Sequence, residues 1–408
     1  MRNNRNVADR EKVVTLYDVA RLAGVSTATV SRVVHGQDRV RESTRARVQQ
    51  AIEELGYVPD GAAQSLSRRR KDIIGLVCVE REVDHIDIEN AGMLYNDEIL
   101  RGVESCIRHR NWSLLITFMQ GDRPDFSRLD TLSGKVDGIL VGEGFLASNV
   151  IERLAARVPL VIIAGPPGER AADVVAADNF SGSAAVITHL IADHGKRRLF
   201  HLDGPQNSPD AGERRRALEY VLRSHPECQL VGSRQGILSV RSGELAGENL
   251  LARYGPALPD AVVCANDQMA IGVLRAFAAG GVRVPQDAAV VGFDDIALGS
   301  FYDPTLTTVY QPMRMLGERA CTRLLDRIAD PDLSPAVELL PTELVLRASC
   351  GCSGEATTRQ PVLPLRADRD GTTARRRSAR RASTPAASTP AASTPAASTP
   401  AGRTSAKA

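Results

Sequence analysis

Polar side chains that can bind a small molecule follow short apolar runs in the second half of the chain. Four of them, each after such a run or in the next predicted helix, are Asp178, Arg214, Asn266 and Asp294. Carboxylates, amides and an arginine suit a neutral polyhydroxylated ligand, because each ligand hydroxyl needs both a donor and an acceptor. Arg214 is expected to open the helix after residues 202–205. The alternative for the Asp and Asn residues is helix capping, which these side chains favour at such positions.

Histidines and cysteines are the residues that would bind a transition metal. His189, His194 and His201 are close in sequence, but their gaps cross a predicted helix-to-strand transition and are not expected to converge. Cys350-Gly-Cys352 is expected to be incidental, since no second Cys/His pair completes a zinc site. The chain has no Gly-x-Ser-x-Gly and no P-loop motif. The sequence therefore predicts no metal, no cofactor and no enzymatic activity.

Residues 15–32 can bind DNA through two short helices joined at a tight turn, a helix-turn-helix. Thr15 is expected to cap the first helix, Gly24 to end it, and Ser26 to cap the second. The second helix is expected to expose Thr27, Ala28, Thr29, Ser31 and Arg32. These small residues let the backbone approach the major groove, and Arg32 can donate a fork to guanine O6 and N7. A helix pair within a larger all-helical domain is the alternative.

The elements that would position these residues are helical at the N-terminus and alternate between strand and helix from Ile73 onward. A third helix is expected from about Ser43 to Gly56. Short, regular apolar runs are typical of buried strands in parallel sheets. Here they are residues 73–77, 113–116, 138–141, 160–163, 199–202, 261–264 and 289–291. The sequence predicts an α/β fold preceded by a small all-α headpiece.

Charge is distributed unevenly along the 408 residues. Residues 1–71 have a net charge of +6, residues 353–408 have +7, and the segment between them has −11, which gives the +2 of the whole chain. Basic ends favour contact with a polyanion there. No apolar run approaches the roughly 20 residues of a membrane helix, and the N-terminus lacks the apolar core of a secretory signal. We expect a cytoplasmic protein whose seven scattered cysteines are reduced thiols.

Four motifs resemble those of the lactose/galactose repressor (LacI/GalR) family: Leu16-Tyr17-Asp18-Val19-Ala20, Ala23-Gly24-Val25-Ser26, Thr29-Val30-Ser31-Arg32-Val33 and Gly56-Tyr57-Val58-Pro59. The resemblance continues through nearly the whole chain and implies a two-lobed effector domain of the type I periplasmic-binding-protein fold. The expected parts are a helix-turn-helix headpiece (1–59), a hinge helix and linker (60–71), an effector-binding and dimerisation domain (72–352) and a disordered low-complexity tail (353–408). Residues 80–96 are longer and more polar than is usual in the family.

The resemblance also implies a hinge over residues 60–67 that orders on operator DNA and inserts Leu66 into the minor groove. Asp60 and Gly61 depart from the family pattern, and Gly61 opposes helix by about 0.5–1 kcal/mol. The basic run 68–71 is either a solvated linker or a phosphate contact. The complete set of expected DNA contacts is Thr15, Leu16, Tyr17, Ser26, Thr27, Ala28, Thr29, Ser31, Arg32, His35 and Leu66.

For the effector, the surroundings of Arg214, Asn266 and Asp294 match the family's binding motifs. Asp178 and Gln311 match more weakly. Leu238 stands where the family often has an aromatic residue, which slightly favours a sugar over a planar purine that needs stacking.

These features predict a ligand-responsive transcription regulator, a repressor that binds a palindromic operator as a homodimer. The tail has no leucine heptad of the kind that makes some family members tetramers; its repeats are expected to be disordered and solubilising, and its arginines to add at most nonspecific DNA attraction. Effector binding is expected to change the spacing of the two hinges. A solute-binding receptor on the same fold is the rival function, but it would need a secretion signal and no headpiece.

Overall fold

The computed structural model of the chain describes residues 14–34, 40–58, 70–80, 92–120, 126–142, 146–166, 171–353 and 358–365. Its N-terminal part contains three helices, α1 (Leu16–Ala23), α2 (Thr27–Val34) and α3 (Glu42–Leu55). The predicted third helix thus begins one residue earlier than expected and ends, as expected, before Gly56, which adopts the left-handed conformation with φ 60°.

The caps of the first two helices are the ones that the sequence predicts. The Thr15 hydroxyl donates to Oδ2 of Asp18 (2.7 Å), and the Thr15 amide donates to the same oxygen (3.0 Å). Gly24 ends α1 with φ 64°. Ser26 caps α2, because its Oγ accepts from the amide of Thr29 (3.2 Å). The turn between the helices is therefore fixed by local hydrogen bonds.

A small apolar core holds the three helices together. It contains Val19, Ala20, Ala23, Val30, Val33, Val48 and Ala51, all buried. Leu16, Ile52, Leu55 and Tyr57 pack against it from the rim. This core leaves one side of α2 free to face a partner.

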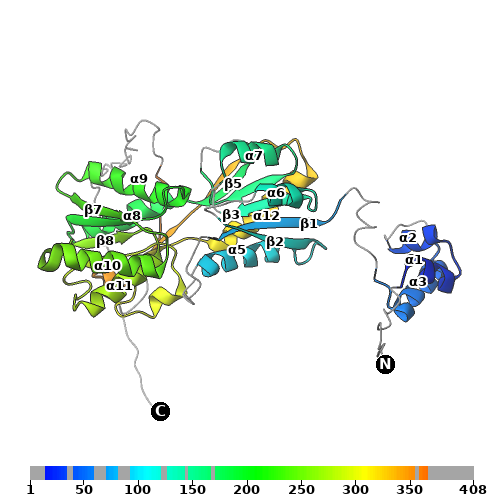
Figure 1. Cartoon of the computed structure of the whole chain (residues 1–408), viewed down its shortest axis with the longest axis horizontal. Coiled ribbons are helices and arrows are strands. Elements are labelled where there is room, and N and C mark those ends of the chain that lie inside the picture. Colours follow the sequence, from blue (N-terminus) through cyan, green and yellow to red (C-terminus); the bar gives the residue numbers. More distant parts are fainter. Residues whose placement is uncertain are drawn as a thin grey trace, which may run out of the picture. The chain divides into compact units, whose positions relative to one another are not determined.

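The first of two parallel sheets has six strands in the order β11-β5-β4-β3-β1-β2. The strands are β1 (Ile73–Glu80), β2 (Ser113–Gln120), β3 (Gly138–Gly142), β4 (Leu160–Ile163), β5 (Asp173–Ala177) and β11 (Val337–Leu340). Helices α6 (Phe126–Ser133) and α7 (Ser148–Ala155) cover one face, and α5 (Gly92–Ile107) and α12 (Met313–Ala329) cover the other (Figure 1). Most of the segment 80–96, which is longer and more polar than usual in the family, lies outside the described residues, from residue 81 to residue 91.

The second parallel sheet has four strands in the order β7-β6-β8-β9. They are β6 (Arg198–Asp203), β7 (Gln229–Gln235), β8 (Ala261–Cys264) and β9 (Ala289–Val291). Helices α8 (Asn179–Ala192) and α9 (Pro209–Ser224) cover one face, and α10 (Val240–Tyr254) and α11 (Asp267–Ala279) cover the other (Figure 1). All seven predicted strands are present in the two sheets, and the predicted two-lobed α/β fold is confirmed.

Three segments join the two lobes. They run from β5 to α8, from β10 (Thr308–Tyr310) to α12, and from β11 to β12 (Glu343–Leu346). Two of them are bonded to each other, since the amide of Asp178 donates to the carbonyl of Leu340 (2.8 Å) and the hydroxyl of Thr342 donates to the carbonyl of Asp178 (3.3 Å).

The prediction that the disordered tail begins at Ser353 is wrong at its start. Residues Thr358–Pro361 form β13, which pairs antiparallel with β12 in a third sheet, β10-β12-β13. Charged and proline-rich composition hid this strand, because its stability comes from pairing with β12 and not from burial of its own side chains. The repeats beyond residue 365 lie outside the described residues.

Two further expectations concern the whole chain. None of the described helices is long and apolar enough to span a membrane. All seven cysteines are free thiols, as the sequence predicts.

Candidate functional site

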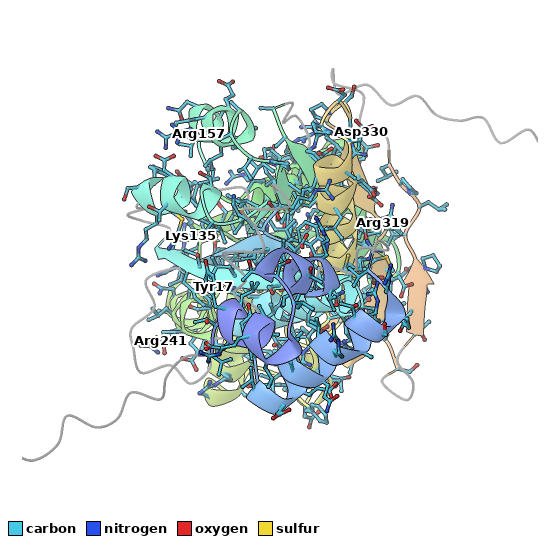
Figure 2. All side chains as sticks on the ribbon, turned by 90° about the vertical axis from the view of Figure 1, so that its right-hand side faces the viewer. Tyr17, Lys135, Arg157, Arg241, Arg319 and Asp330 are labelled. Carbon is cyan, nitrogen blue, oxygen red and sulfur yellow. The ribbon has the colours of Figure 1, made fainter. Side chains whose placement is uncertain are left out.

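The surface predicted to contact DNA lies on α1 and α2. Tyr17 on α1 is 76% exposed (Figure 2). On α2, Ala28 and Arg32 are exposed, while Thr27 and Ser31 are half-buried. The helix therefore presents small side chains and one cation outward, which suits close approach to a DNA groove.

Four of the other predicted DNA contacts also have a role within the headpiece. Thr15 and Ser26 are exposed but act as caps, and Leu16 packs against the headpiece core. Thr29 shares a hydrogen bond of 2.9 Å with the Ser26 hydroxyl. His35 and Leu66 lie outside the described residues.

Three of the predicted effector residues, Arg214, Asn266 and Asp294, lie just beyond the carboxyl ends of the second sheet's strands. Arg214 is 6% exposed, and its Nε donates to Oδ1 of Asn179 (2.8 Å) while its Nη1 donates to the carbonyl of Ala265 (2.5 Å). Its guanidinium lies 3.8 Å from the centre of the Phe293 ring. Arg214 does not open α9 as predicted, because the helix begins at Pro209 and Arg214 lies in its second turn.

Asp294 forms the acidic side of this cluster. Nε2 of Gln311 donates to Oδ1 of Asp294 (2.5 Å), and Nη1 of Arg214 lies 3.7 Å from the same oxygen. Burial raises the pKa of Asp294 to about 8, although the positive charge of Arg214 acts in the opposite direction. The carboxyl is therefore largely protonated at neutral pH and can either donate or accept a hydrogen bond.

Gln311 comes from the segment that joins the lobes between β10 and α12. It is 2% exposed, and its Oε1 has no hydrogen-bond partner within the described structure. A buried amide oxygen without a partner is costly unless a ligand or water donates to it. Gln311, which matches the family pattern only weakly, therefore lies beside Asp294 in the same polar cluster.

The other two predicted residues, Asp178 and Asn266, both cap helices. Asp178 caps α8, since its Oδ1 accepts from the amide of Ser181 (3.0 Å). Asn266 caps α11 by accepting from the amide of Met269 (3.1 Å), and its Nδ2 donates to the carbonyl of Leu238 (3.1 Å). Both keep their predicted place at strand ends, but the Asp178 side chain is committed to the cap.

Three further residues complete the cluster. Asn179 bridges Arg214 and Asp210, donating from Nδ2 to Oδ1 of Asp210 (2.9 Å). Phe293 supplies the ring under the guanidinium. The spacing of Asp210 and Arg214 was a usable signal, because residues four apart share one face of a helix.

The expectation that His189 and His194 do not converge with other ligands is wrong. Their Nε2 atoms lie 3.0 Å apart, and the side chains of Cys350 and Cys352 meet them. The sequence distance between the two pairs hid this arrangement, since the chain folds almost the whole second lobe between them. His201 is elsewhere, buried in β6.

Two known protein families match different parts of the chain. Residues 15–60 match the bacterial regulatory proteins of the lacI family, and residues 187–350 match a periplasmic binding protein-like domain. The ribose operon repressor of Escherichia coli (strain K12) is 35% identical over 329 residues, which cover 79% of this chain and 95% of that protein.

Two further similarities extend over the same length. The HTH-type transcriptional repressor PurR of Pasteurella multocida (strain Pm70) is 32% identical over 346 residues, covering 83% of this chain and 98% of that protein. The solved structure of the lac repressor dimer bound to operator and the anti-inducer ONPF superposes with a TM-score of 0.74 at 29% identity, covering 83% of this chain and 99% of that chain.

Proposed function

Because the chain belongs to the lacI family of bacterial regulatory proteins and is therefore a ligand-responsive DNA-binding repressor, we propose that its effector is a neutral polyhydroxylated molecule, a sugar, bound beside Arg214 and Asp294. The observation that carries this proposal is the buried cluster itself. It offers a guanidinium, a carboxyl that is largely protonated at neutral pH, and the unpartnered Oε1 of Gln311. One of the relatives is a ribose operon repressor.

A sugar fits this cluster better than a charged ligand. Each sugar hydroxyl can donate to Oε1 of Gln311 or to Asp294 and accept from Arg214. An anionic ligand would need more cations than the single guanidinium, whose Nε and Nη1 already donate to Asn179 and Ala265. A planar purine would need a stacking surface, and the Phe293 ring is already covered by the guanidinium.

Coupling between ligand and DNA would pass through the segments that join the lobes. Gln311 lies in one of them and Asp178 in another. Gln311 and Asp294 are directly hydrogen-bonded without ligand, so a ligand that inserts between them would separate the two residues, change the angle between the lobes and with it the spacing of the two hinge segments in a dimer. Couplings of this kind are typically worth about 1–3 kcal/mol.

A homodimer is supported by exposed apolar side chains at the edges of both parallel sheets. Leu115, Ile116 and Phe118 lie on edge strand β2, and Leu230 lies on edge strand β7. Phe118 is 50% exposed, which is unusual for a large apolar side chain on an edge strand unless a partner covers it. A dimer would also match a palindromic operator.

The rival functions are disfavoured for specific reasons. A solute-binding receptor does not account for the capped helix pair of residues 15–34 with its exposed Arg32. An enzyme is not proposed, because the family and its relatives are transcription regulators.

The test has two stages with the purified full-length protein. First, selection from a random DNA library identifies the operator, and size-exclusion chromatography with light scattering gives the oligomeric state. Second, calorimetry with pentoses, hexoses, disaccharides and purine bases identifies the ligand, and operator affinity is measured with and without each binder. A sugar that binds and changes operator affinity supports the proposal, whereas binding by a purine base alone would overturn the sugar assignment.

A further inference from the structure

Four metal-ligating side chains converge at one end of the second lobe. His189 lies in the last turn of α8 and His194 just after it; Cys350 ends the short 3-10 helix η3 (Ala348–Cys350), and Cys352 follows. The four potential ligand atoms all lie within 4.8 Å of one another. We refer to these four residues as the Cys/His cluster.

The individual distances match the edges of a metal tetrahedron. Nε2 of His189 is 3.0 Å from Nε2 of His194, 3.5 Å from Sγ of Cys350 and 3.4 Å from Sγ of Cys352, and Nε2 of His194 is 3.4 Å from Sγ of Cys352. Zinc bonds of about 2.0–2.1 Å to nitrogen and 2.3 Å to sulfur, at tetrahedral angles, require edges of about 3.3–3.8 Å. Four of the six edges are thus within about 0.3 Å of the values for zinc, and the other two, from Sγ of Cys350 to His194 and to Cys352, are at most 4.8 Å long.

The surroundings hold the ligands in place. Nδ1 of His189 lies 2.7 Å from Oδ2 of Asp193, an arrangement that directs Nε2 toward the cluster and is common behind zinc-bound histidines. The Thr307 hydroxyl donates to Sγ of Cys350 (3.1 Å). Gly351 adopts φ 114°, and a Cβ at this position would approach Nδ1 of His194 to 3.0 Å. The sharp turn between the two cysteines thus requires glycine.

Burial and chemistry favour a closed site. Cys350 is fully buried and His189 is 8% exposed, while His194 and Cys352 close the cluster from its solvent side. Two sulfur and two imidazole ligands in a tetrahedral arrangement are typical of zinc, and four protein ligands leave no position for water or substrate. Such a site is structural and not catalytic.

We propose that the Cys/His cluster binds one structural Zn²⁺ ion. The ion would fasten residues 347–352 to the end of α8. The same segment supports the second lobe from within, because Oγ of Ser349 accepts from the amide of Thr307 (2.8 Å) and Nη2 of Arg347 donates to Oδ1 of Asp295 (2.6 Å). This role is independent of which ligand binds beside Asp294.

The experiment uses the full-length protein purified under reducing conditions without chelator. Elemental mass spectrometry should give one zinc per chain. After zinc removal, titration with Co²⁺ should produce the visible absorption of tetrahedral cobalt together with a thiolate-to-cobalt charge-transfer band. The melting temperature should fall by several degrees on zinc removal and return when zinc is added.

Variants separate metal binding from folding. Cys352→Ser and His194→Gln alter the less buried ligands and should lose the stoichiometric zinc and the response of the melting temperature to chelator. Cys228→Ser is the matched control, because Cys228 is a buried thiol of the same lobe outside the cluster, and it should retain one zinc. Asp193→Asn should keep the cobalt spectrum but bind zinc about 10–100-fold more weakly, since Asp193 positions His189 and is not a ligand.

Three results would overturn the proposal. They are a wild-type protein that remains well below one zinc per chain after reconstitution, zinc binding that is equal in Cys352→Ser, His194→Gln and Cys228→Ser, and a Cys350–Cys352 disulfide in protein kept under reducing conditions. Far-UV circular dichroism and operator binding of each variant confirm that a lost zinc does not reflect an unfolded chain.

Discussion

Asp294 gives the sharpest test of the effector site, because two substitutions there should behave differently. Asp294→Ala removes the carboxyl that accepts from Gln311 and lies beside Arg214. Asp294→Asn keeps its shape and imitates the protonated acid, which predominates at neutral pH because burial raises the pKa to about 8. The alanine variant should therefore lose effector affinity at pH 7, and the asparagine variant should largely keep it.

Asp294→Ala has two energetic consequences, an unpaired Gln311 amide and the loss of hydrogen bonds to the ligand, and only the second changes effector affinity. Leaving Nε2 of Gln311 unpaired costs about 1–3 kcal/mol with and without ligand, so this part lowers stability and cancels in the dissociation constant. Only hydrogen bonds between the ligand and residue 294 count toward affinity. Because the carboxyl is largely neutral at pH 7, each such bond contributes about 0.5–1.5 kcal/mol, and about 1.4 kcal/mol corresponds to a factor of ten. One bond therefore accounts for a loss of about twofold to tenfold, and two bonds for a loss of up to about a hundredfold.

The pH dependence follows from the same carboxyl. Ligand hydroxyls that donate to Asp294 favour the carboxylate, so binding releases a proton and wild-type affinity should rise as pH approaches 8; the asparagine variant should show no such rise. The stability of the ligand-free protein depends on pH in the opposite direction, because it falls as pH rises. The folded pKa lies above the unfolded value, so the stability from this group is complete below about pH 4 and is lost as pH rises through about 8.

Calorimetry from pH 6 to pH 9 measures the affinities, and operator binding without effector is the control that should stay unchanged. Asp287→Ala is a matched substitution, because Asp287 is an aspartate of the same lobe that pairs with Arg283 away from the cluster. Wild-type affinity in the Asp294→Ala protein, or a parallel pH profile in wild type and Asp294→Asn, would refute this assignment of Asp294.

Three other predictions address DNA binding and stability. Arg32→Ala should cost about 1–3 kcal/mol on the selected operator and relax preference at one symmetric base pair; equal weakening of operator and random DNA by Arg32→Ala would reduce Arg32 to a phosphate contact. Leu66→Ala should lower operator affinity and reduce DNA bending while the headpiece stays folded, because an apolar wedge kinks the duplex at an easily unstacked central step; an unchanged bend angle speaks against the wedge. Burial lowers the pKa of His201 to about 4, so the stability from its neutral form is present above about pH 6.5 and is lost as pH falls through about 4. His201→Gln should therefore flatten the melting temperature between pH 6.5 and 4, His109→Gln on the surface should not, and identical acid profiles for all three proteins would exclude this contribution.

The headpiece was predictable because its determinants are local. Thr15 with Asp18, Gly24 and Ser26 lie within a few residues of the bonds that they make. The strands were predictable for a related reason, since a short run that is buried on both faces is apolar throughout. The strand β13 was not, because its residues are exposed and its formation depends on β12.

The partners within each site were harder to predict, because they come together only through the topology. Asp178 and Asn266 were predicted because each follows a strand. Their place in the sequence does not determine whether the side chain points toward a helix terminus or into the cluster. In the structure the first residue after β5 caps α8, and the next, Asn179, contacts Arg214. The Cys/His cluster shows the same limit at greater distance, since α9, α10 and α11 lie in sequence between its two halves.

The backbone at Asp294 and Asp295 is supported by two arginines, one of which lies in a part of the chain that was expected to be unstructured. Asp294 and Asp295 have φ angles of 128° and 57°, a backbone that side chains other than glycine rarely adopt and that costs of order 1–3 kcal/mol per residue. Oδ1 of Asp295 accepts from Arg347, and Oδ2 accepts from Arg359 of β13, each at 2.6 Å. The bond to Arg347 is buried and charge-assisted, so it is strong enough to offset much of this strain, while the half-exposed Arg359 adds less. The carboxyl that we assign to the effector is thus held by a neighbour, Asp295, whose main partner Arg347 directly follows β12, and the pairing of β13 with β12 adds the weaker contact from Arg359.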